Sequence, residues 1–492
     1  MNDSTKMRLG ALGAVLAAIA LRIYFVWQFP FFEAGDTPIY RELAENWLRH
    51  GIYGLDVLGR LQAVDIRMPG YPAFLAGIYS VFGESARAVM LAQAGIDVLT
   101  CVLAAGIAAV IAPKASRSRV ALAALWMAAV CPFTANYTAV VLTETLATFL
   151  TALALLVLLE AMREERLFAG EAQEARGVGA NAGNSMRWLL GGIVAGFGTL
   201  VRPETPLLLA GVGVVLVVLW RRPANWAKLA RATALMAVGL ALPLLPWVAR
   251  NWQVLHEVQF LAPRNAEMPG EYVHAGFSSW EKTWLWRFGD VFTVSWNVDG
   301  EEIHPQDLPA SAFDSQAERE NVLRLLAQYN ESTKMTPELD RQFGEIARER
   351  TERHPLRTYV TVPLLRALTL WFAPRIEMLP LSGHLWPIAK WWQDSESEYC
   401  YSLGLFLIGI AYGVMAFIGA WRSWRNPMAM ALVAFIVIRT AFLTTVEGPE
   451  PRYVLECFPA VFALAAQLWT KRAAASGQIR ELCSAEPSLR EF

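Results

Sequence analysis

Long apolar blocks constrain this chain more than any other feature. Several have about the 20 residues that a helix needs to cross the hydrocarbon core of a bilayer. The composition agrees, because 55% of the residues are hydrophobic and only 18% are charged, whereas about a quarter are charged in soluble domains. We predict an all-α polytopic membrane protein with about 10 or more transmembrane helices. The candidate spans are residues 9–29, 87–112, 119–136, 140–160, 187–201, 204–221, 231–249, 399–421, 427–446 and 453–470.

The positions of the basic residues predict the orientation. Lys and Arg are enriched in cytoplasmic connections, and a cytoplasmic N-terminus places every basic cluster on that side. The first cluster precedes an apolar run without a small-residue cleavage site, so we interpret this run as an uncleaved span. We therefore predict a multi-pass protein of the cell (cytoplasmic) membrane with both termini in the cytoplasm. The clusters are Lys6/Arg8, Lys114/Arg117/Arg119, the 163–187 segment, Arg221/Arg222/Lys228/Arg231, Arg422/Arg425 and Lys471/Arg472.

Four regions follow from this pattern. We expect a membrane domain at 1–250 with an outer loop at 31–86, an outer-face domain at 251–398, membrane helices at 399–471 and a cytoplasmic tail at 472–492.

Finer expectations concern the connections. Apolar residues at helical spacing predict outer helices at 314–328 and 337–353. Pro363 and Arg366 interrupt an apolar stretch, so residues 356–396 are interpreted as amphipathic helices lying in the outer interface. The Glu-, Arg- and Gly-rich segment 163–186 is interpreted as a flexible cytoplasmic loop.

The first outer loop holds the most prominent candidate residue, Asp36. After it, Tyr40, Leu43, Ala44, Trp47 and Leu48 recur at three- and four-residue steps, which predicts an amphipathic helix. Asp36 near the start of this helix has a simple alternative role as an N-cap. Its place at the membrane surface instead favours a site where a lipid headgroup meets a water-soluble acceptor.

Other charged residues also cluster at the predicted outer ends of the spans. Arg67 is either a ligand-binding cation or an interfacial anchor paired with Asp65. Glu144 is either a functional acid near a span end or a solvated loop residue. The remaining candidates are Arg202 with Glu204, which form either a site or a structural pair, and Glu450 with Arg452, whose guanidinium either binds phosphate or balances the neighbouring acid.

Several classes of function are disfavoured. The net charge of −1 gives no indication of nucleic-acid binding. The five cysteines and six histidines show no metal-ligand spacing. No phosphate-binding glycine loop occurs, which argues against a nucleotide-driven pump.

Taken together, these segments resemble the membrane glycosyltransferases of the GT-C class, in particular the superfamily of protein O-mannosyltransferases and aminoarabinose (lipid A) transferases. The resemblance rests on a series of segments that covers most of the chain: GDTPIYRELAENWLRHGIYG, RMPGYPAFLAGIYSVFG, LTETLATFL, LVRPETPLLL, LPWVARNW, RHPLRTYVTVPLLRALTLW and EPRYVLECFPAVFALAA. It implies a GT-C-like helical bundle with outer-face helices, an inverting transfer, and a sugar donor carried on a polyprenyl phosphate.

The resemblance also implies roles for particular residues. Asp36 matches the essential acid of the family's first outer loop, and Glu144 stands where members commonly have an acid near the fourth span. Arg67 matches a basic residue before the loop's second proline, and Arg452-Tyr453 match the pair before the last span. Thr37 departs from the protein mannosyltransferases, which have a second acid there, and this argues against a close relative of those enzymes.

The chemistry implied by the family agrees with these residue types. Asp36 is expected to act as the general base toward the acceptor hydroxyl or amine. Arg67, Arg452 and Tyr453 are expected to bind the donor phosphate, with Asp65, Arg202, Glu204 and Glu450 in support. Glu144 is a candidate either to orient the acceptor or to help hold a divalent cation. The acceptor stays open among glycan, lipid and protein, and the apolar body would house the lipid tail.

Two other classes compete with this hypothesis. A transporter or a flippase for envelope glycolipids would place charges near the bilayer midplane, often in duplicated halves. Here the charges gather at outer loop ends and no internal repeat occurs. A scaffold subunit would not need Asp36, Glu144 and Arg452 to converge, so the distances among these residues discriminate between the hypotheses.

Overall fold

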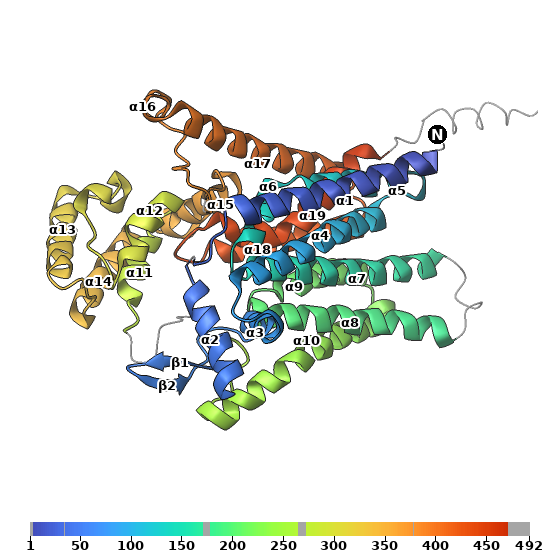
Figure 1. Cartoon of the computed structure of the whole chain (residues 1–492), viewed down its shortest axis with the longest axis horizontal. Helices are drawn as coiled ribbons and strands as arrows, with labels where there is room; N and C mark the ends of the chain where they lie inside the picture. Colours follow the sequence, from blue (N-terminus) through green and yellow to red (C-terminus); the bar gives the residue numbers. More distant parts are fainter. Residues whose placement is uncertain (1–2, 34, 171–177, 264–271, 377, 471–492) are drawn as a thin grey trace, which may run out of the picture.

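The computed structural model describes residues 3–33, 35–170, 178–263, 272–376 and 378–470. These residues form a bundle of long helices and, at one of its ends, a cluster of short helices and a small hairpin (Figure 1). The long apolar helices identify a multi-pass membrane protein. In Figure 1 the start of α1 and the facing ends of α7 and α8 lie at the end of the bundle opposite to the short helices.

The bundle consists of six long helices and several shorter ones. The long helices are α1 (Asp3–Gln28), α4 (Ala86–Ile111), α7 (Glu144–Gly170), α8 (Val178–Val201), α10 (Trp226–Leu255) and α17 (Glu396–Arg422). The shorter ones are α5 (Arg117–Ala129), α6 (Pro132–Asn136), α9 (Leu207–Leu219), α18 (Pro427–Leu443) and α19 (Phe458–Ala465).

The prediction of ten or more spans is met only in part. Among the described residues, five helices are long and apolar enough to cross a membrane, and six if the bent pair Lys114–Ala129 and Pro132–Ala139 counts as one span. The helices α9 and α18 are apolar but have only 13 and 17 residues. At 1.5 Å per residue, 13 residues cover about 20 Å, less than the roughly 30 Å of a hydrocarbon core.

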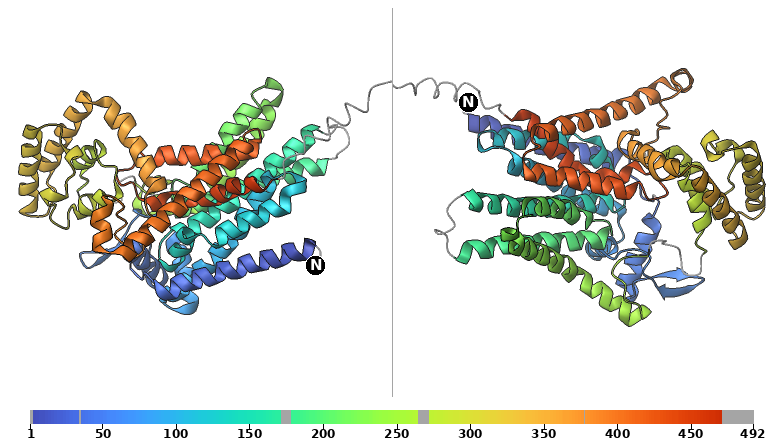
Figure 2. Two further views of the ribbon diagram at one scale, coloured as in Figure 1. Left: turned by 90° about the horizontal axis from the view of Figure 1, so that it is seen from above. Right: turned by 180° about the vertical axis from the view of Figure 1, so that it is seen from behind.

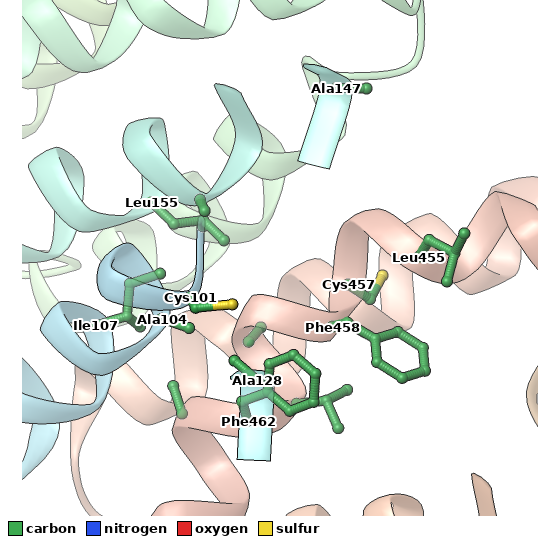
Figure 3. Close-up of a cluster of buried hydrophobic side chains, with 14 of the residues drawn as sticks. Cys101, Ala104, Ile107, Ala128, Ala147, Leu155, Leu455, Cys457, Phe458 and Phe462 are labelled. Atoms are coloured by element: carbon green, nitrogen blue, oxygen red, sulfur yellow. The ribbon is translucent and has the colours of Figure 1, made fainter. Parts of the chain in front are cut away.

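The core of the bundle forms where α19 packs against α4, α7 and α17. Phe458 and Phe462 of α19 lie with Cys101, Ala104 and Ile107 of α4 in one buried cluster (Figure 3). All eight residues of α19 are buried. A central helix of this kind has no lipid-facing side, so the ends of α19 are positioned by protein on every side.

One buried ion pair lies inside the bundle. Arg22 of α1 donates from Nε to Asp97 Oδ2 of α4 at 2.9 Å, and both side chains are almost fully buried. The guanidinium also donates to the carbonyl of Ala128 at 3.0 Å. A charge in a span is tolerated when it is paired, and this pair ties α1, α4 and α5 together.

The first outer loop folds back onto the end of the bundle. It contains α2 (Thr37–His50), strands β1 (Gly54–Val57) and β2 (Arg60–Ala63), and α3 (Gly70–Phe82). The antiparallel hairpin pairs Gly54 with Ala63 and Val57 with Arg60, around a turn in which Leu58 and Gly59 both have positive φ. This hairpin is a departure from the predicted all-α fold, and its turn places Leu58 in a backbone conformation that residues other than glycine seldom adopt.

The predicted amphipathic helix is confirmed as α2, with one correction. Tyr40, Leu43 and Ala44 are buried, as its spacing predicted. Trp47 and Leu48 are exposed instead, because the apolar face of α2 is covered only along its first turns.

The segment predicted to be the outer-face domain, called the outer domain below, is a separate small core of helices. It is built from α11 (Ala275–Lys282), α12 (Phe288–Thr293), α13 (Gln316–Asn330) and α14 (Pro337–Arg353) around buried aromatic residues such as Phe277 and Phe343. The two predicted outer helices are confirmed as α13 and α14. Figure 2 shows this domain projecting beyond the end of the bundle in both additional views.

The segment that joins the outer domain to α17 contains only short helices. They are a π-helical turn (Arg357–Thr361), α15 (Val362–Phe372) and α16 (Ile388–Asp394). The π-helical turn runs directly into α15, so residues 355–372 form one continuous helix, which is not among the described helices long and apolar enough to cross a membrane. Arg366 is buried and donates to the carbonyls of Leu285 and Thr444, so α15 joins the outer domain to the bundle.

Two predictions concern the end of the bundle away from the outer domain: one is corrected, and the other is not tested. The predicted loop at 163–186 is wrong in extent, because α7 continues to Gly170 and α8 begins at Val178. Ion pairs such as Arg187–Glu164 hold these helix ends together. The predicted tail at 472–492 lies outside the described residues.

Candidate functional site

Nearly all the predicted site residues meet at one end of the bundle. Asp36 precedes α2, Glu144 begins α7, and Arg202 and Glu204 occupy the turn between α8 and α9. Arg452 and Tyr453 lie in the 3-10 helix Pro451–Cys457, just before α19. Together with Arg67 they line a cavity of about 260 Å³. An enzyme requires Asp36, Glu144 and Arg452 to converge, whereas a scaffold does not. These three residues do converge here.

Asp36 does not act as a helix cap. Its side chain makes no capping hydrogen bond to α2, and Oδ1 instead accepts from Nη2 of Arg67 at 2.9 Å. The Thr37 hydroxyl donates to the carbonyl of Val141 at 2.9 Å, which anchors the start of α2 beside α7. The carboxylate is consequently held toward the cavity.

Arg67 is positioned by the turn that leads into α3. Gly70 packs so closely on the end of α8 that a Cβ there would lie 2.6 Å from the carbonyl oxygen of Leu200. Burial lowers the pKa of Arg67, whereas the negative charge of Asp36 raises it, and the net shift of the pKa is upward. The predicted pairing of Arg67 with Asp65 is wrong, because the guanidinium turns to Asp36.

Glu144 is buried, not solvated, with 2% of its surface exposed. Its Oε1 lies 3.3 Å from Nη1 of Arg202 and 3.4 Å from Nη1 of Arg452. Its other oxygen, Oε2, is buried and accepts no hydrogen bond from the described residues. A buried carboxylate oxygen without a donor is costly, so Oε2 is available to a ligand.

Behind the cavity lies a charge network that sequence reasoning missed in part. Arg202 donates from Nε to Glu204 at 2.8 Å, as the predicted pair requires, and also contacts Glu456 at 3.3 Å. Arg439 of α18 contacts Glu204 at 3.2 Å and Glu456 at 2.6 Å. Arg439 and Glu456 are charged residues inside apolar runs, and that signal marks them as candidates.

Arg452 and Tyr453 are both held by Glu450. Arg452 donates from Nε to Glu450 Oε2 at 2.5 Å, and the Tyr453 hydroxyl donates to Oε1 at 2.5 Å. The Tyr453 ring lies between two guanidiniums, 5.2 Å from Arg202 and 5.4 Å from Arg452. Such cation–π contacts fix the two cations. Arg452 thus has both roles at once: its charge is balanced by Glu450, and its guanidinium faces the cavity.

The cavity brings together opposite charges in equal number. Asp36, Glu144 and Glu204 face Arg67, Arg202 and Arg452. Within the described part of the chain, no three His, Cys, Asp or Glu side chains are grouped closely enough to hold a metal ion. The arrangement can therefore hold an anionic group by guanidiniums beside a carboxylate that can accept a proton.

Comparison with known proteins shows the class of fold. No family model and no curated protein sequence match the chain. Among solved structures, the oligosaccharyltransferase of Archaeoglobus fulgidus, tethered with an acceptor peptide containing the NVT sequon, matches with a TM-score of 0.51 and 14% identity. That alignment covers 94% of this chain and 49% of the other. The chain thus spans about half the length of that oligosaccharyltransferase.

Other matches are weaker. The same archaeal enzyme with an inhibitory peptide and a dolichol-phosphate aligns with a TM-score of 0.48 and 13% identity, over 99% of this chain and 52% of the other. ArnT from Cupriavidus metallidurans, bound to undecaprenyl phosphate, aligns with a TM-score of 0.39 and 12% identity, over 95% and 78%. The chain is thus similar in fold to GT-C enzymes, as the sequence resemblance predicted.

Proposed function

We propose that the protein is an inverting glycosyltransferase that moves a sugar from a polyprenyl-phosphate donor to an acceptor on the outer face of the membrane. One observation carries the proposal: the carboxylate of Asp36 and the guanidiniums of Arg67, Arg202 and Arg452 line a single cavity. The GT-C-like fold and the sequence resemblance support the same class of reaction.

The cavity suits both ends of such a donor. Its walls include Leu443 and Val446, at and just beyond the end of α18, which form an apolar side toward the bundle. A polyprenyl chain would follow this side into the membrane. Arg452 is suited to the phosphate, since its Nη1 contact with Glu144 is 3.4 Å long, well beyond a strong charge-assisted bond of about 2.8 Å.

The reaction would proceed by a single displacement. The acceptor oxygen or nitrogen forms a bond to the anomeric carbon on the face opposite the phosphate. The bond between that carbon and the phosphate oxygen breaks, and its electron pair leaves with the polyprenyl phosphate. Asp36 accepts the acceptor's proton, while Arg452 and Arg67 stabilise the charge that develops on the leaving phosphate.

The direct test is transfer by the purified full-length protein. Detergent-solubilised protein is incubated with a panel of polyprenyl-phosphate sugars and candidate acceptors, and release of polyprenyl phosphate is followed by mass spectrometry. We expect release with one donor class, accompanied by a glycosylated acceptor in which the transferred sugar has the inverted anomeric configuration. Failure of every donor, under conditions in which the protein stays folded, would contradict the proposal.

A further inference from the structure

A second cavity, of about 560 Å³, lies beside the first. Asp36, Arg452 and Tyr453 line both cavities, so these three residues form the boundary between them. A transferase needs two ligands that meet at one reacting centre. The second cavity therefore has the right place for the other substrate if the donor phosphate occupies the first.

Part of the wall of this cavity is aromatic. Phe288 and Phe292 of α12 and Trp296 just beyond it recur every four residues and therefore share one face. Their rings are packed edge to face, with centroids 4.7 Å apart for Phe288–Phe292 and 4.3 Å apart for Phe292–Trp296. Phe292 and Trp296 keep 40% and 51% of their surfaces exposed, so ring faces remain open to a ligand.

This aromatic wall is fixed relative to the site. α12 lies on the side of the outer domain that faces the bundle (Figure 1). Val291 of α12 packs against the loop that leads to Arg452, because a Cβ on Gly448 would lie 3.4 Å from its side chain. Phe288 is nearly buried in the core of the outer domain. The open rings are thus supported from beneath.

The charges of the two cavities differ. The first has three carboxylates and three guanidiniums. Among the described residues, the second is lined by three carboxylates, from Glu33, Asp36 and Glu450, and by one guanidinium, from Arg452. A second anionic ligand would meet unfavourable charge there, whereas hydroxyl groups can donate hydrogen bonds to carboxylates.

We propose that this second cavity binds the acceptor and that the acceptor is a neutral or amino sugar ring, stacked on Phe292 and Trp296 with a hydroxyl directed at Asp36. This inference rests on the proposed function for the role of acceptor, while the binding of sugar stands by itself. A pyranose presents an apolar face of C–H groups, which pack on aromatic rings, and an edge of hydroxyls, which bond to carboxylates. Both complements, aromatic rings and carboxylates, line the cavity.

The first experiment measures binding without transfer. Saturation-transfer-difference NMR is recorded on the full-length protein in detergent with methyl β-galactoside, methyl β-glucoside and N-acetylglucosamine. We expect binding to the wild type, with the strongest saturation on the ring protons of one face. Galactose 6-phosphate and short Ser-, Thr- or Asn-containing peptides serve as the competing ligand classes, and we expect markedly weaker binding for both.

Variants connect the binding to the aromatic wall. Removing the two open rings together, in F292L/W296L, should weaken sugar binding by roughly tenfold or more, since each aromatic contact contributes about a 2- to 12-fold effect. W296F keeps a ring and should retain most of the affinity. W252L is the matched control, because Trp252 is an exposed tryptophan at the outer end of α10 that lines neither cavity.

The outcomes separate this inference from the proposed function. Transfer to a peptide or a phosphorylated acceptor, with equal kinetics in F292L/W296L, would overturn the sugar acceptor and leave the transferase intact. Sugar binding that is lost in F292L/W296L, in a protein that uses no polyprenyl-phosphate donor, would support the sugar site and contradict the transferase. Equal sugar binding by F292L/W296L and the wild type would overturn the inference directly.

Discussion

Two kinds of carboxylate surround the candidate cavity. The Asp36 side chain is 38% exposed and contacts one guanidinium, whereas Glu144, Glu204 and Glu456 are almost buried and contact arginines. A general base must reach both its ligand and the solvent, while a positioning group must stay fixed. The difference in exposure supports the proposal that Asp36 transfers the proton and that the buried acids hold the arginines.

Replacing Asp36 by Asn should abolish most turnover without unfolding the protein. Asn keeps the size of the side chain but cannot take the proton, so we expect kcat to fall by about 10²- to 10⁴-fold. Stability should change little, because Asp36 does not cap α2 and a partly exposed ion pair contributes at most about 1 kcal/mol. Transfer kinetics and thermal unfolding of Asp36→Asn check both parts. Retention of most activity would remove Asp36 from the mechanism.

Replacing Arg452 by Lys should impair donor binding. Lysine keeps the charge but loses the planar fork that reaches Glu450 and Glu144 at once. We expect the donor KM to rise on the order of tenfold, the value of one lost charge-assisted hydrogen bond, with a lower kcat. Steady-state kinetics at varied donor concentration measure this change. A donor KM and kcat like those of the wild type would restrict Arg452 to charge balance.

Removing the buried acid Glu456 should destabilise the fold. Glu456→Ala leaves Arg439 and Arg202 without one of their carboxylates in a buried network, and breaking such a pair costs about 3–5 kcal/mol. Thermal unfolding in detergent measures the loss. The matched control is Glu320→Ala on α13, where the acid is exposed and its removal should leave the melting temperature nearly unchanged. Equal melting temperatures for both variants would contradict a structural role of the network.

At the scale of elements, the sequence predicted where several helices lie, but not which elements contact one another. Periodicity located α2, α13 and α14, because burial of one face is a local property of the sequence. The hairpin Gly54–Ala63 was missed, since its short strands lack a long alternating pattern. Asp36, Glu144 and Arg452 were found from their places at span ends. Glu456 and Arg439 were missed as a pair because their contact joins α18 to the 3-10 helix Pro451–Cys457, which no local pattern encodes.

The joint between the outer domain and the bundle contains an unusual acid. Burial in α11 raises the pKa of Glu281 to about 8, although the hydroxyl of Ser295, which donates to its side chain at 2.5 Å, opposes this shift. The negative charge of Glu447 raises the pKa further, while Arg366 and Lys282 lower it. Arg366 of α15 and Glu447 of the loop after α18 belong to the bundle side. The pKa of Glu281 therefore depends on the contact between the outer domain and the bundle.

The pH dependence of stability should reflect Glu281. Its folded-state pKa lies above the unfolded value of about 4.5, so the folded protein binds the extra proton. The stabilising contribution is complete below pH 4.5 and is lost as the pH rises through about 8. Melting temperatures between pH 5 and 8.5 should decline less steeply for Glu281→Gln, which stays neutral. The exposed Glu302→Gln serves as control, and parallel curves for wild type and Glu281→Gln would contradict the effect.

At the scale of the whole molecule, charge is sorted between the two ends of the bundle. At the end opposite to the cavity, Asn426 donates to the carbonyl of Ile111, and Arg231 pairs with Glu165. These contacts join the turn after α17 to the end of α4, and α10 to α7. The outer domain and the cavity share the other end. A lipid-linked donor and a soluble acceptor meet most simply at such an end.

This arrangement leads to a prediction of membrane topology. Lys114, Arg222 and Arg425 should face the cytoplasm, because basic connections are retained there, and Asp36, Gly300 and Glu450 should face outward. Single cysteines at positions 114, 222, 425 and 300, placed in a chain whose native cysteines are replaced, are labelled in intact cells with a membrane-impermeant maleimide. Only position 300 should react before the membrane is permeabilised, and the other three should react afterwards. A Cβ at position 300 would meet no atom within 4 Å, so a cysteine can be placed there without a clash. Labelling of position 300 only after permeabilisation would place the whole cavity on the cytoplasmic side, and the proposed outer-face transfer would then be wrong.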